Sequence, residues 1–308
     1  MLQLIESLPS PWRDAVLGAL IGDALGVPHE FKPGHVVPTM SQIHMVMPAG
    51  YPKTYDRIPY GTWSDDGSQL LGLLEALHHG KGQYQRSRFL ANLQSWLKHG
   101  WFQAGGVVFD CGGQTRAALA SHDTGEELLG FSQEHCGNGS LMRVLPVAAL
   151  PDAYGVSKDM AISIAIDQSC VTHPQWVGQV CCALYVELCW LLQDGWPTAQ
   201  STVHGAGEVL RDRKILPPEG IKALAKVLAH GSQNLPTGSG YVVTTLWAAV
   251  WALSQGKSLS EVVRRAISLG DDTDTIACVA GGLAALVYGI DPLARSWSQQ
   301  MTYVALAK

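Results

Sequence analysis

The sequence has few charged residues and no concentration of basic ones. Charged residues make up 15% of the 308-residue chain, the formal net charge is −5, and the 21 Lys and Arg residues are scattered. A nucleic-acid-binding protein gathers basic side chains on one surface, so we expect no strong nucleic-acid footprint. Hydrophobic residues make up 47% of the chain, which indicates a large buried core rather than a disordered chain.

The sequence also lacks Cys-X-X-Cys pairs, a recognisable signal peptide and a membrane-spanning run. Its seven cysteines are therefore expected to be reduced thiols of a cytoplasmic protein, with Cys181, Cys182 and Cys189 filling the core. The most apolar run, residues 180–192, is shorter than a bilayer requires and contains Glu187. We predict that it is a core helix and that the protein does not associate with membranes.

No linker and no strand pattern interrupts the chain. Because no Pro-, Gly- or Ser-rich boundary divides it, we predict one compact domain over residues 1–308, and we expect a monomer. Apolar residues recur at helical spacing rather than in alternation, so the predicted fold is an all-α helical bundle. The predicted helices cover residues 12–26, 70–77, 89–97, 175–194, 221–229, 241–253, 259–268, 275–288 and 292–304.

The first predicted helix carries a glycine at every fourth position, at Gly18, Gly22 and Gly26. Glycine inside a helix costs up to about 1 kcal/mol relative to alanine. The spacing therefore indicates that another backbone packs closely against this helix. Glu30 follows the helix, and the next residues, 32–60, are predicted to form an irregular loop.

Two stretches concentrate oxygen-bearing side chains ahead of apolar helices. Residues 270–275 read Gly-Asp-Asp-Thr-Asp-Thr, and residues 64–66 read Ser-Asp-Asp. One such residue suffices to cap a helix, so capping is the simpler reading of each stretch, whereas the surplus favours a hard divalent cation. If the fold brings the stretches together, six side chains supply a binuclear Mg²⁺ or Mn²⁺ site: Ser64, Asp65, Asp66, Asp272, Asp274 and Thr275.

Three further segments combine glycine or histidine with helix starts. Asp110 precedes Gly112 and Gly113, where either the close approach of a ligand or capping by Asp110 explains the residues. The loop at 137–140 reads Gly-Asn-Gly-Ser before a predicted helix, and its backbone N–H groups suit a phosphate, although the spacing matches no standard nucleotide motif. His173 stands at another helix entrance, where a histidine is more often a cap or core residue than a ligand.

Taken in order, these segments resemble the ADP-ribosylglycohydrolase family over nearly the whole chain. The matching segments are residues 18–26, Glu30, 63–66, 109–112, 137–143, Thr172-His173 and 270–275. Each is short, but their shared order is specific. The first metal motif departs from the family's common Thr-Asp-Asp-Thr at its two ends: Ser64 keeps a hydroxyl, whereas Gly67 has none.

The resemblance implies an all-helical fold with two divalent cations, Mg²⁺ or Mn²⁺, at one end of the bundle. It also implies hydrolysis of the bond between C1″ of ADP-ribose and an acceptor atom. The sequence leaves the acceptor open: an arginine or serine side chain of a protein, a nucleic-acid end or a small molecule. Either Glu30 or Asp110 would serve as acid or base, and the rim loops 32–60 and 231–240 would decide the acceptor. The residues expected to contact ADP-ribose are Gly112, Gly137, Asn138, Gly139, Ser140, Met142 and His173.

Other protein classes fit the same carboxylates less well. Terpenoid synthases require DDxxD, and Asp271, Asp272 and Asp274 have the wrong spacing. Haloacid-dehalogenase-like phosphatases place their Asp-X-Asp motif after an early strand, whereas here it follows a late helix. The alternative from a different class is a non-catalytic ADP-ribose-binding or structural protein that keeps the family fold; retention of Asp65 and Asp66 beside the later pair argues against it.

Overall fold

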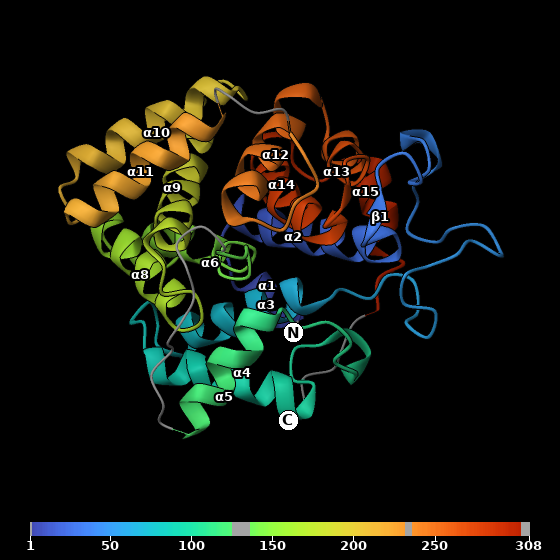
Figure 1. The fold of residues 1–308 in the computed structure, drawn as a ribbon, viewed down its shortest axis with the longest axis horizontal. Coiled ribbons are helices and arrows are strands. Elements are labelled where there is room, and N and C mark those ends of the chain that lie inside the picture. Colours follow the sequence, from blue (N-terminus) through green and yellow to red (C-terminus); the bar gives the residue numbers. More distant parts are fainter. Residues whose placement is uncertain (1, 125–135, 232–235, 303–308) are drawn as a thin grey trace.

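The computed structural model describes residues 2–124, 136–231 and 236–302. Helices dominate this part of the chain, which confirms the all-α prediction (Figure 1). The helices are α1 (Leu2–Glu6), α2 (Trp12–Gly26), α3 (Asp65–His79), α4 (Arg86–His99), α5 (Gly113–Thr124), α6 (Leu145–Ala148), α7 (Leu150–Tyr154), α8 (Lys158–Cys170), α9 (Trp176–Gln193), α10 (Gln200–Asp212), α11 (Pro218–Gly231), α12 (Val242–Gln255), α13 (Leu259–Ile267), α14 (Thr273–Tyr288) and α15 (Pro292–Ser298).

The predicted helices are all present, with ends that differ by a few residues in most cases. Four helices were not predicted from the sequence: α8, α10 and the short helices α1 and α7. The last predicted helix, 292–304, ends at Ser298 in the structure, and its residues 303 and 304 lie outside the described residues.

Two strands of two residues each were also missed. β1 (Lys32–Pro33) pairs antiparallel with β2 (Gly270–Asp271). A strand of this length cannot show alternation of apolar and polar residues, so no periodic signal marks it. Most of residues 34–60 are irregular as predicted, and this loop projects from one side of the molecule (Figure 1).

Helix α9 runs through the interior. By length and composition it could cross a membrane, but 89% of its apolar window is buried inside the fold, so it is a core helix as predicted. Cys181, Cys182 and Cys189 lie on it as buried free thiols, and they fill the core as expected.

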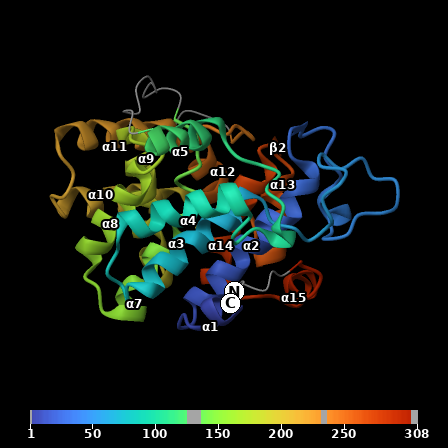
Figure 2. The same cartoon turned by 90° about the horizontal axis from the view of Figure 1, so that it is seen from below.

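Helices α2 and α14 lie side by side in both views (Figures 1 and 2). A Cβ atom on Gly22 would lie 2.0 Å from the carbonyl oxygen of Ala277, and one on Gly18 would lie 2.5 Å from that of Gly281. A Cβ atom on Gly26 would lie 2.4 Å from the Cα of Asp274. The glycine face of α2 is therefore the surface on which the α14 backbone packs, which confirms the prediction from the glycine spacing.

We predict that Gly22→Ala destabilises the protein by about 3 kcal/mol, the upper end of the usual cost of overpacking, because the added methyl group would meet backbone atoms that no side-chain rearrangement can move. The control is Gly72→Ala within α3, where the nearest atom to an added Cβ is 3.6 Å away. There alanine should be neutral or stabilising by up to about 1 kcal/mol. Denaturant unfolding measures both variants, and equal stability of the two would refute close backbone packing at Gly22.

Candidate metal and ligand site

The two acidic stretches converge at one place. Helix α3 begins at Asp65 and α14 begins at Thr273, one residue after Asp272. The hydroxyl of Thr275 donates a hydrogen bond of 3.2 Å to Oδ1 of Asp66. Carboxylate oxygens of Asp66 and Asp274 lie within 4.8 Å of each other and of an oxygen of Asp23. Two helix starts that are far apart in the sequence therefore share one cluster.

Asp23 was not among the predicted site residues. It is fully buried in the middle of α2, and its carboxylate accepts hydrogen bonds from the backbone N–H of Ser64 at 2.9 Å and of Gly67 at 2.7 Å. Asp23 thus caps the N-terminus of α3 from a different helix. The available signal was a carboxylate within the otherwise apolar residues 15–26, but the helix that it caps cannot be identified from the sequence.

A second group of carboxylates shares Asp274. One oxygen each of Glu30, Asp110 and Asp274 lies within 4.8 Å of the others. Glu30 follows a 3-10 turn at the end of α2 and is 5% exposed, while Asp110 belongs to the loop ahead of α5. The hydroxyl of Thr54, from the irregular loop, donates to the carbonyl oxygen of Glu30 and fixes its backbone. The two predicted acid–base residues are therefore neighbours.

Three oxygens in these groups are buried without a hydrogen-bond partner within the described residues. They are Oε2 of Glu30, Oδ2 of Asp66 and Oδ2 of Asp274. Burying an ionised carboxylate without a partner costs several kcal/mol, so the arrangement calls for protons or cations. The donors around them are carboxylate and hydroxyl oxygens, which suit Mg²⁺ or Mn²⁺. The residues present fit divalent cations.

The protein environment favours the protonated forms of these carboxyl groups when no cation is bound. Burial raises the pKa of Asp23 from its ordinary 3.8 to about 7. Burial, followed by the charge of Asp110, raises the pKa of Glu30 from 4.5 to about 9. Burial first, and then neighbouring carboxylates, hold the pKa values of Asp66 and Asp274 well above the usual range. A bound cation would reverse this preference.

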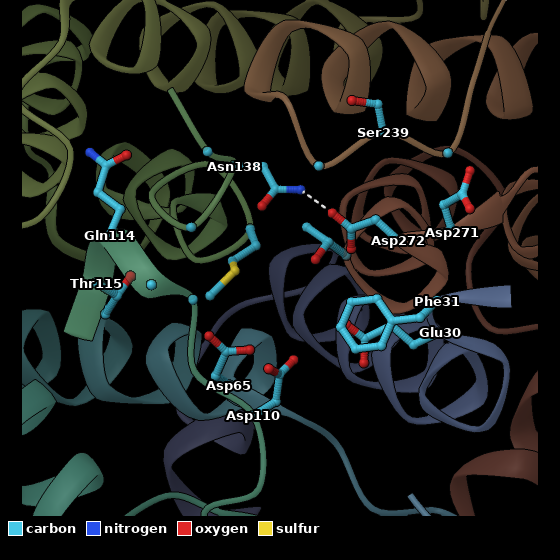
Figure 3. Close-up of a pocket in the computed structure, with 18 of the residues that line it drawn as sticks. Glu30, Phe31, Asp65, Asp110, Gln114, Thr115, Asn138, Ser239, Asp271 and Asp272 are labelled. Atoms are coloured by element: carbon cyan, nitrogen blue, oxygen red, sulfur yellow. Dashed lines mark hydrogen bonds between the residues drawn. The ribbon is translucent and has the colours of Figure 1, made fainter. Parts of the chain in front are cut away.

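A cleft of about 530 Å³ opens above the carboxylates (Figure 3). Its walls include most of the predicted site residues: Glu30, Asp65, Asp110, Gly112, Gly137, Asn138, Gly139, Met142, His173, Asp272 and Thr275. Predicted residues that do not line it are Ser64, Asp66, Ser140 and Asp274. Gly238, Ser239 and Gly240 of the predicted rim loop 231–240 also line it. Lining residues that were not predicted are Phe31, Gly113, Gln114, Thr115 and Asp271.

Two predicted serines do not line the cleft itself. The Ser64 hydroxyl accepts a 3.3 Å hydrogen bond from the backbone N–H of Asp66 and caps α3. Ser140 is fully buried, and its hydroxyl accepts a 2.9 Å hydrogen bond from Ser169. Ser140 therefore stabilises the loop from behind and does not contact the cleft. The predicted helix after this loop is α6, which is four residues long and begins only at Leu145, so backbone groups of the loop itself, rather than a helix end, face the cleft.

Asn138 ties the glycine loop to the opposite wall. Its Nδ2 donates to Oδ2 of Asp272 at 2.7 Å, as Figure 3 shows, and to the hydroxyl of Thr245 at 2.9 Å. Its backbone N–H donates to the carbonyl oxygen of Gly240 at 3.2 Å. The rim loop predicted at 231–240 is described from residue 236 onward; residues 232–235 lie outside the described residues.

Gly67 has no space for a larger side chain. An added Cβ would lie 2.7 Å from Cδ2 of Leu20 and 2.8 Å from Cδ1 of Trp63. The volume that a threonine would need is occupied by these two side chains. Leu20 and Trp63 therefore pack where the family's threonine side chain would lie. The backbone N–H of Gly67 donates a hydrogen bond to Asp23.

Comparisons with known proteins give one consistent family. The ADP-ribosylglycohydrolase family model matches residues 8–308. ADP-ribosylarginine hydrolase Tri1 of Pseudomonas putida (strain GB-1) is 30% identical over 296 residues, covering 94% of this chain and 74% of the relative. ADP-ribosyl-dinitrogen reductase glycohydrolase of Rhodospirillum rubrum is 24% identical over 297 residues, covering 93% and 88%. A solved chain described as an ADP-ribosylglycohydrolase-related protein complex is 27% identical with a TM-score of 0.66, covering 94% of this chain and 96% of that one.

The buried carboxyl groups predict an unusual dependence of stability on pH. Because the folded-state pKa of Asp23 is raised to about 7 and that of Glu30 to about 9, the folded protein binds more protons than the unfolded chain above the ordinary carboxyl pKa values. This contribution to stability is present in acid and is lost as the pH rises through the folded-state values. In chelator-treated protein we expect Tm to fall from pH 5 to pH 8 by at least about 3 °C, the shift that about 1 kcal/mol produces.

Added Mg²⁺ or Mn²⁺ should raise Tm more at pH 8 than at pH 5, because the cation binds the deprotonated form. The control is the Asp66→Asn/Asp274→Asn double variant, whose Tm should respond less to both pH and metal. Thermal unfolding in the presence and absence of EDTA provides the measurement. A Tm that rises with pH in the chelated wild type would contradict the arrangement.

Proposed function

Because the chain belongs to the ADP-ribosylglycohydrolase family and is a hydrolase of ADP-ribosyl bonds, we propose that it uses two divalent cations to release ADP-ribose from the arginine side chain of a modified protein. We also propose that residues 1–308 act as one domain. The observation that carries the proposal is the pair of carboxylate groups sharing Asp274 beside the cleft, with oxygens that lack partners within the described residues.

The ligands we propose are the six side chains of the two acidic helix starts: Ser64, Asp65, Asp66, Asp272, Asp274 and Thr275. Asp23 has a different role, since both of its oxygens already accept backbone hydrogen bonds. When bound, the cations would stabilise negative charge on ribose oxygens and favour deprotonation of water.

Glu30 and Asp110 supply the proton transfers that glycosidic cleavage needs. One carboxylate accepts a proton from the attacking water, and the other carboxyl group donates a proton to the departing nitrogen of the acceptor. Their oxygens lie within 4.8 Å of each other, and after burial the charge of Asp110 is the next cause that raises the pKa of Glu30. The two groups therefore titrate as a coupled pair, and a state in which the pair shares one proton is favoured over one in which both are ionised. Asn138 and the glycine loop would orient the ADP-ribose above them.

The mouth of the cleft suits a cationic acceptor. Phe31, 67% exposed, and Asp271 both line the cleft, and both adopt the left-handed backbone conformation, with φ of 60° and 53°. The 2.6 Å hydrogen bond from the Phe31 N–H to the Asp271 carbonyl, next to the β1–β2 pairing, holds them there. Such strain persists only where the surroundings enforce it. An aromatic ring and a free carboxylate can bind a guanidinium by cation–π contact and charge-assisted hydrogen bonds.

The first test of this proposal is hydrolysis of ADP-ribosyl-arginine protein with and without metal. EDTA should abolish the activity, and Mg²⁺ or Mn²⁺ should restore it. Asp274→Asn should lower kcat/KM by at least about 100-fold, because it removes charge that offsets two dications, while the control Asp14→Asn on the surface of α2 should leave it unchanged. Full turnover in a metal-free preparation would refute metal dependence. Binding of ADP-ribose without hydrolysis of any linkage would favour a non-catalytic binding protein.

The second test concerns the acceptor. Phe31→Ala and Asp271→Asn should each lower kcat/KM about fivefold to tenfold for the arginine-linked substrate and less than twofold for a serine-linked one, because only the guanidinium is a cation. Phe31→Tyr keeps the ring and should retain most of the activity. Equal losses on both substrates would show that the mouth does not select by charge.

A further inference from the structure

Arg143 is completely buried between the site and the core, yet all of its hydrogen-bond partners are uncharged. Its Nε donates to Oε1 of Gln168 at 2.9 Å, and its Nη1 donates to Oε1 of Gln69 at 2.8 Å. Its Nη2 donates to the Gln168 carbonyl oxygen and to Oγ1 of Thr172, both at 2.9 Å. A guanidinium has donors and no acceptor, so each of these oxygens must accept.

The hydrogen bond from Arg143 to Thr172 also determines which ring nitrogen of His173 carries a proton. Oγ1 of Thr172 lies 2.8 Å from Nδ1 of His173. Because the hydroxyl accepts from Arg143, its own proton is directed to Nδ1, which must then be the unprotonated nitrogen. The opposite assignment, with a proton on Nδ1, would leave the buried hydroxyl proton without an acceptor. Burial, and then the charge of Arg143, lower the pKa of His173 to about 3, so the ring is neutral.

The remaining proton of the ring is therefore on Nε2. His173 lines the cleft, and its Nε2 lies 3.6 Å from the position that a Cβ on Gly137 would take and 3.3 Å from that on Gly139. These glycines leave the imidazole edge open. Nε2 has no hydrogen-bond partner among the described contacts of the chain, so its N–H is available to a ligand in the cleft.

The Arg143 guanidinium also orients the side-chain amide of Gln69, which contacts Asp65. Because Oε1 of Gln69 accepts from Arg143, its amide nitrogen faces the other way and donates to Oδ2 of Asp65 at 3.0 Å. The positions of the amide oxygen and nitrogen of Gln69 are thereby determined by their hydrogen-bond partners, one a donor and the other an acceptor. Asp65 is held as an acceptor on one wall of the cleft, and His173 as a donor on another.

We propose that Arg143 is a positioning residue that fixes the direction of hydrogen bonding at the site. Through Thr172 it makes His173 an Nε2–H donor to an oxygen of bound ADP-ribose, and through Gln69 it orients the Asp65 carboxylate. The identity of the ligand, ADP-ribose, depends on the proposed function. The tautomer of His173 follows from the chain alone.

The test begins with the tautomer in the ligand-free wild type. Nitrogen-15 NMR of the histidine rings, assigned with His173→Gln, should show His173 with Nδ1 unprotonated and Nε2 protonated. Thr172→Val, which removes the hydroxyl at nearly constant volume, should abolish this preference, while the control Thr172→Ser should keep it. A wild-type ring with its proton on Nδ1, or an unchanged tautomer in Thr172→Val, would overturn the proposal. The wild-type spectrum decides the matter even if the valine variant fails to fold.

Calorimetric binding of ADP-ribose is the second readout. Thr172→Val should weaken binding about fivefold to tenfold, as expected for one weakened hydrogen bond, and Thr172→Ser should remain within about twofold of the wild type. Equal affinity of the valine and wild-type proteins would contradict donation by Nε2. If the wild type itself does not bind ADP-ribose while its His173 shows the Nε2–H tautomer, the proposed function fails and the positioning role of Arg143 stands.

Discussion

The close approach of the α2 and α14 backbones is the constraint on which the site depends. The absence of side chains at Gly18, Gly22 and Gly26 lets α14 settle against α2, and the Thr273 hydroxyl then donates a 2.9 Å hydrogen bond to the Gly26 carbonyl oxygen. This contact sets the distance between Asp23 and Asp274. Were either helix displaced by the width of a methyl group, the shared carboxylate cluster could not form.

The protein handles charge differently on the two sides of the cleft. Around Asp274 it buries like charges together and leaves oxygens without partners, which is unfavourable unless a cation or protons compensate. Around Arg143 it buries a single cation among neutral oxygens. The side chains of Gln69 and Gln168 that accept from it donate in turn from their amide nitrogens to other groups. The first arrangement creates affinity for an ion. The second creates a fixed pattern of donors and acceptors, because the guanidinium never loses its protons.

The main helices and the acidic residues of the site were predictable from the sequence, because their signals are periodic or lie within a few neighbouring residues. Apolar spacing located α2, α9 and α14, and the crowding of Asp65 and Asp66 with Asp272 and Asp274 indicated a shared site. What could not be predicted depends on contacts between distant segments. Asp23 caps another helix, and Ser140 faces inward because Ser169 lies behind it. The left-handed backbone of Phe31 is enforced by Asp271, and nothing in the residues around Phe31 marks it.

The two-residue pairing of β1 with β2 has a consequence for the order in which the protein becomes competent. It joins the segment after Glu30 to the segment before Asp272, which lie near opposite ends of the chain. Contacts between such distant segments form late, because loop closure must be accomplished first. During synthesis, residues 1–269 contain most of the cleft but neither of the carboxylates at 272 and 274. Because the proposed cation site includes both of these carboxylates, a chain synthesised only as far as residue 269 could not form it.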